Sequence, residues 1–167
     1  MWKALLILPF NVTIAVPAAI LWLSAGGAFG GELPNPATVA FWTGAALLGS
    51  GLFLMAGTMR LFRRLGEGTP APWDPPKRMV IAGPYRHVRN PMIGGVIAVL
   101  FGEAAMTMSP GLLAWAALFL LANMIYIPLF EEPGLERRFG EDYRTYRRHV
   151  PRWIPRLTPW RGFENGS

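Results

Sequence analysis

Two clusters of charged side chains, set in a mostly apolar chain, are suited to bind a small zwitterion. Arg86, His87 and Arg89 stand just before Pro91, which opens a long apolar run, and Glu131-Glu132 closes the next apolar run about forty residues later. If the two runs pair as a hairpin, the basic and acidic clusters meet at one membrane face. Carboxylates then pair with an ammonium and guanidiniums with a carboxylate. We therefore predict a zwitterion-binding pocket here.

Smaller features near the basic cluster fit the same pocket. Pro91 suits the first turn of a helix, where its missing N–H costs nothing, and the N–H groups that follow favour an anion. Gly94 removes a side chain one turn later, where a flat ring can approach the backbone, although helix packing explains it almost as well. Tyr85, Tyr143 and Tyr146 can stack on a ring or contact a cation, or simply pack.

One further carboxyl lies inside an apolar run. Glu103 falls about 16 Å along the helix that Pro91 opens if that helix is regular, which is near the middle of a bilayer. A charge there is costly, so we expect Glu103 to be protonated, paired with a polar group such as Asn123, or lining a cavity. A place in a substrate tunnel is one interpretation of this residue.

The composition favours a membrane protein over a nucleic-acid-binding protein, and it argues against cysteine chemistry and a metal site. Hydrophobic residues make up 52% of the 167 residues and charged residues 16%, with a formal net charge of +6. This apolar content favours an anionic lipid surface over nucleic acid as the partner of the basic residues. The chain has no Cys, and its two His, His87 and His149, are far apart. We therefore predict no disulfide, no thiolate nucleophile and no metal site.

Apolar runs long enough to cross a membrane position these residues. About 20 apolar residues cover a hydrocarbon core about 30 Å thick. The sequence predicts an all-α integral membrane protein in which residues 1–167 form a single membrane domain. The predicted elements are four transmembrane helices, about 4–24, 39–59, 92–108 and 112–130, a cytoplasmic loop, 60–91, and a C-terminal amphipathic interfacial helix, about 132–150. A signal peptide is the alternative for the first run, because Lys3 precedes it and small residues follow.

Small residues recur at close helical spacing in the second predicted span. Gly44, Gly49, Gly51 and Gly57 allow the backbones of neighbouring helices to approach each other. We expect this span to pack tightly against another helix. The same residues permit a dimer without requiring one, so the oligomeric state stays open.

The C-terminal stretch is amphipathic and does not form a fifth span. Leu135, Phe139, Tyr143, Tyr146 and Val150 recur at helical spacing, while charged residues fill the other faces. A helix of this kind lies at a membrane interface or covers a site.

The distribution of Lys and Arg orients the predicted spans. The loop 60–91 and the chain after Phe130 hold nearly all of these residues, whereas the turns at 26–38 and 109–111 hold none. By the positive-inside rule, both termini and the predicted pocket lie on the cytoplasmic side. We expect an integral membrane protein, in the plasma membrane of a bacterium or an archaeon.

These motifs resemble the isoprenylcysteine carboxyl methyltransferase and phospholipid methyltransferase superfamily. The resemblance rests on GPYRHVRNPMIGG at 83–95, on Glu131-Glu132, and on the leucine, phenylalanine, glycine and tyrosine residues that follow up to Ile154-Pro155. It covers close to half of the chain, and two linked motifs at the expected separation make it specific.

The resemblance implies an enzyme that transfers a methyl group from S-adenosylmethionine to a lipid or lipophilic small molecule entering from the bilayer. The cofactor then lies among the last two spans, the motif loop and the C-terminal helix. Glu132 and Arg89 are the expected catalytic residues, and Glu103 and Arg152 are assigned to a substrate tunnel. The expected cofactor contacts are Tyr85, Arg86, His87, Arg89, Asn90, Gly94, Glu131, Glu132, Tyr143 and Tyr146.

Two positions depart from the superfamily pattern and keep other functions open. Asn90 stands where a His usually precedes Pro91, and Ile93 stands where a Tyr follows it. Asn90 can form hydrogen bonds but cannot titrate, and the loss of the Tyr points to a different acceptor. Carboxylates, amines, phenols and thiols all stay open. One alternative is an NADPH-dependent membrane reductase of the sterol reductase type. Another is a non-enzymatic membrane sensor or assembly protein on a degenerate methyltransferase scaffold.

Overall fold

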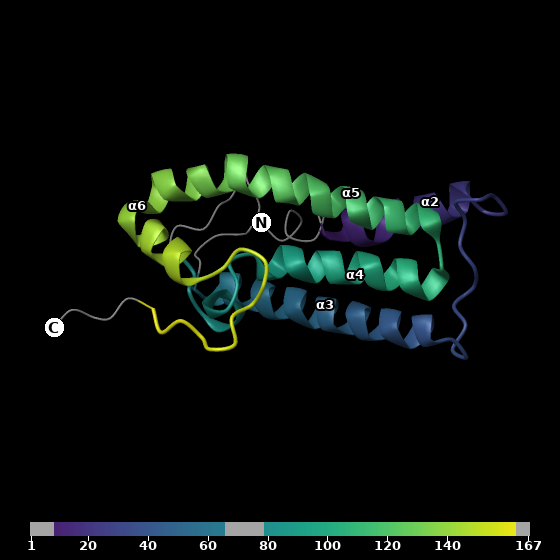
Figure 1. Cartoon of the computed structure of the whole chain (residues 1–167), viewed down its shortest axis with the longest axis horizontal. Helices are drawn as coiled ribbons and strands as arrows, with labels where there is room; N and C mark the ends of the chain where they lie inside the picture. The colour runs from purple at the N-terminus through teal and green to yellow at the C-terminus, as the bar shows by residue number, and fades with distance from the viewer. Residues whose placement is uncertain (1–8, 66–78, 163–167) are drawn as a thin grey trace.

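The computed structural model describes residues 9–65 and 79–162, and every regular element within these ranges is a helix. In chain order the elements are η1, Asn11–Ala15; α2, Val16–Leu23; α3, Val39–Leu65; η2, Gly83–Arg86; α4, Pro91–Thr107; α5, Pro110–Tyr126; η3, Ile127–Glu131; and α6, Glu132–His149. Helices α3, α4 and α5 lie lengthwise beside one another with α4 in the middle, and α2 lies against α5 (Figure 1). Helix α6 continues from η3 and turns back over one end of the bundle.

Two helical stretches are long and apolar enough to cross a membrane, Val39–Phe62 and Pro110–His149. The apolar helices Asn11–Leu23 and Pro91–Thr107 are shorter. With 17 residues, α4 is about 26 Å long. Length and composition therefore support two of the four predicted spans, and the arrangement of four spans stays a prediction.

Some boundaries differ from those predicted. Helix α3 begins at Val39 as predicted but continues to Leu65, so Arg60 and Arg64 lie on the helix rather than in a loop. Residues 66–78 of the predicted loop lie outside the described residues, as do residues 4–8 of the first apolar run.

Glycines set the close approach of α3 and α4. A Cβ atom on Gly51 would lie 2.5 Å from the carbonyl oxygen of Gly95, and one on Gly44 would lie 2.6 Å from that of Gly102. Side chains do not fit at these distances, so the two backbones touch at two levels. Part of the predicted small-residue surface of α3 therefore serves helix packing.

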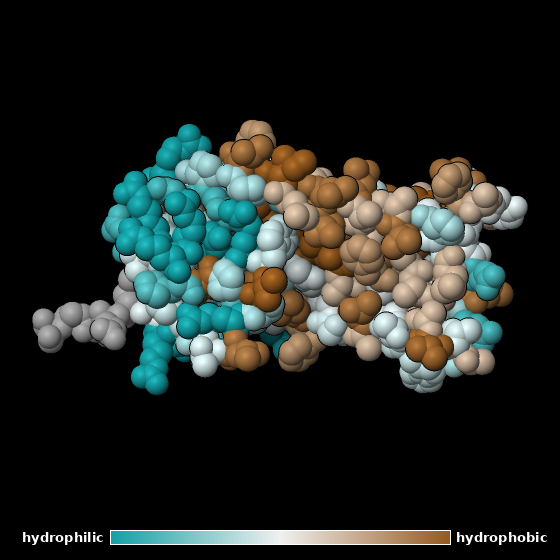
Figure 2. Space-filling model, in the orientation of Figure 1, coloured by the Kyte–Doolittle hydropathy of each residue, from teal (hydrophilic) through white to brown (hydrophobic). Residues whose placement is uncertain are grey.

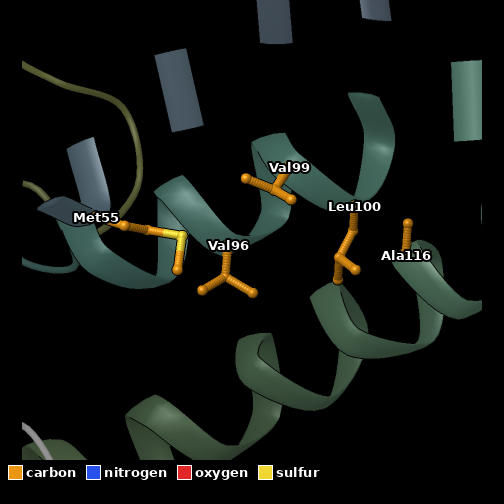
Figure 3. Packing of buried hydrophobic residues seen from close by; sticks show 5 residues of the cluster. All are labelled: Met55, Val96, Val99, Leu100 and Ala116. Atoms are coloured by element: carbon orange, nitrogen blue, oxygen red, sulfur yellow. The ribbon is translucent and has the colours of Figure 1, made fainter. Parts of the chain in front are cut away.

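The bundle core lies where α4 meets its two long neighbours. Met55 of α3, Val96, Val99 and Leu100 of α4, and Ala116 of α5 are buried and pack together (Figure 3). Because these side chains come from three helices, they fix α4 between α3 and α5, and with it the loop that precedes α4.

The predicted fourth span and the C-terminal helix form one continuous helix, Pro110–His149. At their junction the N–H of Glu132 donates to the carbonyl of Ile127, five residues back. Pro128, inside this π-turn, and Pro133, just after it, lack an N–H and interrupt the regular i to i−4 bonding. The apolar part, residues 110–130, measures about 31 Å, so it covers a bilayer core and ends where the two glutamates begin.

Gly140 bends α6 back toward the bundle. Its φ of 58° and ψ of −130° are not helical, and glycine adopts such a conformation at little cost. Beyond the bend, Tyr143, Tyr146 and Val150 are buried and pack with Met79, Ile81, Leu135, Phe139 and Trp160. The amphipathic helix thus buries this face against its own chain, while its hydrophilic residues gather at one end of the molecule (Figure 2).

Candidate functional site

The α4–α5 hairpin brings the basic and acidic clusters together. Arg89 directly precedes the N-cap residue of α4, and Glu132 begins α6. Arg89 Nη1 lies 2.9 Å from Glu132 Oε1, and the two side chains are only 9% and 5% exposed. The predicted meeting of Arg89 with the acidic pair at one end of the bundle is therefore present in the structure.

A second arginine reaches Glu132 from the C-terminal segment. Arg152 Nε donates to Glu132 Oε1 at 2.6 Å, and Arg152 Nη2 donates to Oε2 at 2.9 Å. These two parallel bonds are the strong geometry of an arginine–carboxylate pair, and they raise the pKa of Arg152 above its ordinary value. Glu132, which is 4% exposed, thus lies between two guanidinium groups.

The Arg89 guanidinium is buried with hydrogen-bonding capacity to spare. Although its Nη1 is within ion-pair distance of Glu132, neither Nη1 nor Nε has a hydrogen-bond partner among the described residues. A buried charged donor without an acceptor is costly. The two N–H groups are therefore suited to an anionic group of a ligand.

Glu131 differs from its neighbour in burial and in partners. It is half-buried, and its carboxylate makes no hydrogen bond or ion pair with the described residues. Burial raises the pKa of the Tyr85 hydroxyl, and the nearby Tyr146 and Glu131 raise it further. Glu131 therefore lies close enough to Tyr85 for its charge to act on that side chain.

Three predicted cofactor contacts instead touch backbone carbonyls of the C-terminal segment. Arg86 Nε donates to Trp160 O at 2.6 Å, and His87 Nδ1 lies 2.8 Å from Arg156 O. The Asn90 amide donates to the carbonyl of Arg152 at 3.3 Å. Backbone bonds run beside these contacts, from the Arg89 N–H to Pro151, the Arg156 N–H to His87 and the Trp160 N–H to Arg86. The motif loop is thus tied to residues 151–160, and a cofactor role for these three side chains stays a prediction.

The predicted tyrosines line the same end of the bundle. The Tyr146 hydroxyl donates to the carbonyl of Tyr85 at 2.7 Å, in a buried bond. Tyr143 lies within electrostatic reach of Arg89, Glu131 and Glu132. All three tyrosines therefore surround the charged cluster, and each is buried.

The first comparison with known proteins concerns the family. Residues 39–142 match the family described as phospholipid methyltransferase. The matched stretch is more than half of the chain and includes α3, α4, α5 and α6 up to Asp142. The chain belongs to the phospholipid methyltransferase family. Members are membrane-associated methyltransferases, and this membership supports methyltransferase activity.

Two relatives share part of this family sequence. Over 76 residues the chain is 41% identical to methanethiol S-methyltransferase 2 of Bradyrhizobium diazoefficiens, covering 44% of this chain and 27% of that protein. Over 71 residues it is 35% identical to phosphatidylethanolamine N-methyltransferase of Yarrowia lipolytica, covering 42% of this chain and 8% of that protein. The chain therefore matches about a quarter of the first relative and under a tenth of the second. No solved structure matches.

Gly94 and Gly95, which are neighbours on α4, have different surroundings. A Cβ atom on Gly95 would lie 2.9 Å from the carbonyl of Gly51, whereas one on Gly94 would have no atom within 4 Å. Gly95 is thus required by packing. Gly94 lies one helical turn from Asn90, to whose carbonyl its N–H donates, and it has open space around it; its place in the cofactor site stays a prediction.

Glu103 lies on α4, away from the cluster. Its Oε2 is buried and has no hydrogen-bond partner among the described residues. The amide of Asn123, which the sequence suggested as a partner, donates to the carbonyl of Phe119 in its own helix. A tunnel role for Glu103 stays a prediction.

Sequence reasoning missed the role of the C-terminal segment at the cluster. It assigned Arg152 to a substrate tunnel, which stays a prediction. In the structure Arg152 binds Glu132, and the Trp160 ring packs on Tyr146 and His149, with centroids 5.8 and 5.3 Å apart. No local pattern marks these contacts, because Arg152 is 20 residues from Glu132 in the chain.

Proposed function

We propose that this protein is an S-adenosylmethionine-dependent methyltransferase acting on a lipid or lipophilic small molecule. The observation that carries the proposal is the buried Arg89 guanidinium, which keeps two N–H groups without hydrogen-bond partners beside the Glu132 carboxylate. Membership of the phospholipid methyltransferase family supports the same reaction class.

The amino-acid part of the methyl donor fits the charges of this cluster. Its α-carboxylate suits Arg89 Nε and Nη1. An ionised carboxylate offers about four lone-pair positions, and Arg152 and Arg89 approach Glu132 at three, two on Oε1 and one on Oε2. Glu132 therefore keeps room on Oε2 for the α-ammonium. We assign Arg89 and Glu132 to this binding, and Gly94 and the tyrosines to the remainder of the cofactor.

When bound, S-adenosylmethionine supplies a methyl group on a positively charged sulfur, and its in-line transfer asks mainly for alignment and exclusion of water. The chain's own contribution is to hold the cofactor end of the site with Arg89 and Glu132, and to exclude water with Tyr85, Tyr143 and Tyr146. The acceptor would enter from the bilayer beside α4. We retain four spans with both termini cytoplasmic, and Glu103 in the acceptor path, as parts of this proposal.

Calorimetric titration of the detergent-purified protein with S-adenosylhomocysteine, with NADPH in parallel, tests the proposal. We expect binding of the first ligand alone. Arg89→Gln should weaken that binding at least tenfold, because it removes both donors that lack partners. Glu141→Gln, on the exposed side of α6, is the matched control and should bind as the wild type does. Binding of NADPH alone would redirect the function to a reductase, and binding of neither would favour a non-enzymatic role.

A further inference from the structure

Two large apolar side chains of the C-terminal segment are exposed. Ile154 is 80% exposed and Leu157 is 98% exposed. Single exposed apolar side chains are ordinary on a protein surface. These two, however, lie three residues apart on a short stretch that has no helix or strand of its own and is nevertheless held in place. We therefore ask what covers them.

Hydrogen bonds fix the backbone of this segment to the loop that precedes α4. Three backbone bonds do so, from the N–H of Arg89 to Pro151, of Arg156 to His87 and of Trp160 to Arg86. The segment crosses the end of the bundle at which α4 begins (Figure 1). Ile154 and Leu157 lie between these bonded positions, so neither side chain can turn inward without breaking them. Their exposure is a property of the fold.

The length of α4 gives one measure of where the segment lies in a membrane. With 17 residues, α4 is about 26 Å long, which is shorter than a hydrocarbon core of about 30 Å. In the proposed arrangement of four spans, Pro91 therefore starts α4 at the edge of that core. The residues that bond to the segment precede Pro91 by two to five positions. The segment thus lies at the level of the lipid headgroups.

The end of the apolar run 110–130 gives a second measure. Its last residue, Phe130, is 62% exposed, which suits a side chain that faces lipid. Glu132 follows two residues later and accepts bonds of 2.6 and 2.9 Å from Arg152. Ile154 is two residues beyond Arg152. Two separate helices therefore place the exposed pair at the same membrane level.

The neighbouring side chains also suit a lipid interface. Arg161 is exposed and Trp153 is half-buried. Tryptophan is enriched at membrane–water interfaces, and an anionic leaflet attracts arginines that lie close to its surface. Because the segment lies at headgroup level, lipid is a better match for its apolar side chains than a soluble protein is.

We propose that the C-terminal segment binds the anionic cytoplasmic leaflet, with Ile154 and Leu157 inserted just below the headgroups and Arg161 among them. This inference rests on the proposed arrangement of spans and goes beyond the proposed function. Transfer of the two side chains out of water stabilises the contact. Because the same segment carries Arg152, the bilayer also helps to hold that guanidinium on Glu132.

Nitroxide labels on single cysteines test the proposal in the full-length protein, because the chain has no Cys of its own. The protein is placed in nanodiscs of phosphatidylcholine and phosphatidylglycerol. Ile154→Cys and Leu157→Cys report on the segment. Leu118→Cys, at a position 58% exposed on α5, is the reference for lipid, and Glu141→Cys, at a position 62% exposed on α6, is the reference for water. All four positions are exposed, so the label displaces no packed side chain.

Electron paramagnetic resonance measures how often each label collides with O₂, which concentrates in lipid, and with a nickel chelate, which stays in water. We expect the ratio of O₂ to nickel collisions at positions 154 and 157 to be several times the ratio at position 141. It should stay below the ratio at position 118, because the segment lies near the headgroups.

A ratio at position 154 or 157 equal to that at position 141 overturns the inference. Rare collisions with both reagents overturn it too, because a protein surface then covers the segment. Spectral broadening from two nearby labels would identify a second copy of the chain as the occupant instead.

Failure of the proposed arrangement of spans gives a different result. The label at position 118 would then itself show the ratio of water, whereas failure of the inference alone leaves position 118 in lipid. The proposed methyltransferase function is tested separately by the S-adenosylhomocysteine titration, which does not depend on these labels.

Discussion

Glu132→Gln should lower the free energy of unfolding more than Arg89→Gln does, although the two residues are partners in one ion pair. Glu132→Gln keeps the shape of the side chain but removes the charge that lies 2.6 and 2.9 Å from Arg152 and 2.9 Å from Arg89. Arg89, at 9% side-chain exposure, would then be buried without a counter-charge. Arg89→Gln, in contrast, leaves Glu132 with both bonds from Arg152.

The contacts that each substitution removes set the expected loss in free energy of unfolding. Breaking a buried ion pair from one side costs about 3–5 kcal/mol. We expect the lower end, about 3 kcal/mol, because Arg152 is 32% exposed and can turn to water. At about 2–4 °C per kcal/mol for a chain of this length, Tm falls by about 6–12 °C. Arg89→Gln loses the contact with Glu132, which is not a well-aligned hydrogen bond, and the interaction with Tyr143, together about 1–2 kcal/mol or about 2–8 °C.

Thermal unfolding in detergent, followed by intrinsic fluorescence, measures the two shifts. Glu141→Gln serves as the control, because Glu141 is 62% exposed and pairs only with exposed arginines, a contribution of about 0–1 kcal/mol. If Glu132→Gln is as stable as Arg89→Gln, or more stable than the wild type, the buried charge cluster does not hold this end of the molecule together. S-adenosylhomocysteine affinity should fall in both variants of the cluster.

Two glycine substitutions test other parts of the structure. Gly51→Ala should destabilise the fold by about 1–3 kcal/mol in the same unfolding assay, because its Cβ would lie 2.5 Å from the carbonyl of Gly95. The control Gly57→Ala, whose Cβ would have no atom within 4 Å, should leave the stability unchanged. Equal shifts in Tm for the two variants would contradict the α3–α4 packing. Gly94→Leu should fold normally but weaken S-adenosylhomocysteine binding by calorimetry, whereas unchanged binding would remove Gly94 from the site.

Several features of the site were predictable because they depend on order along the chain. Charged runs must lie outside apolar ones, and a short turn such as that before Pro110 makes neighbouring helices antiparallel. The ends of α4 and α5 that carry Arg89 and Glu132 therefore meet. The small-residue surface of α3 was predictable in kind, but which glycines pack was not. Gly44 and Gly51 touch α4, while Gly49 and Gly57 face open space.

The sequence by itself determined that the chain is helical and apolar, and that the basic and acidic clusters share one end of the bundle. These properties follow from local composition and from the polarity of each run. Only the tertiary structure decided which glutamate is buried, because a π-turn with its i to i−5 bond carries no sequence signal beyond one proline inside it and one just after it. It also decided that Arg152 reaches Glu132, since that contact needs Gly140 to reverse α6 and the C-terminal segment to bond to the motif loop.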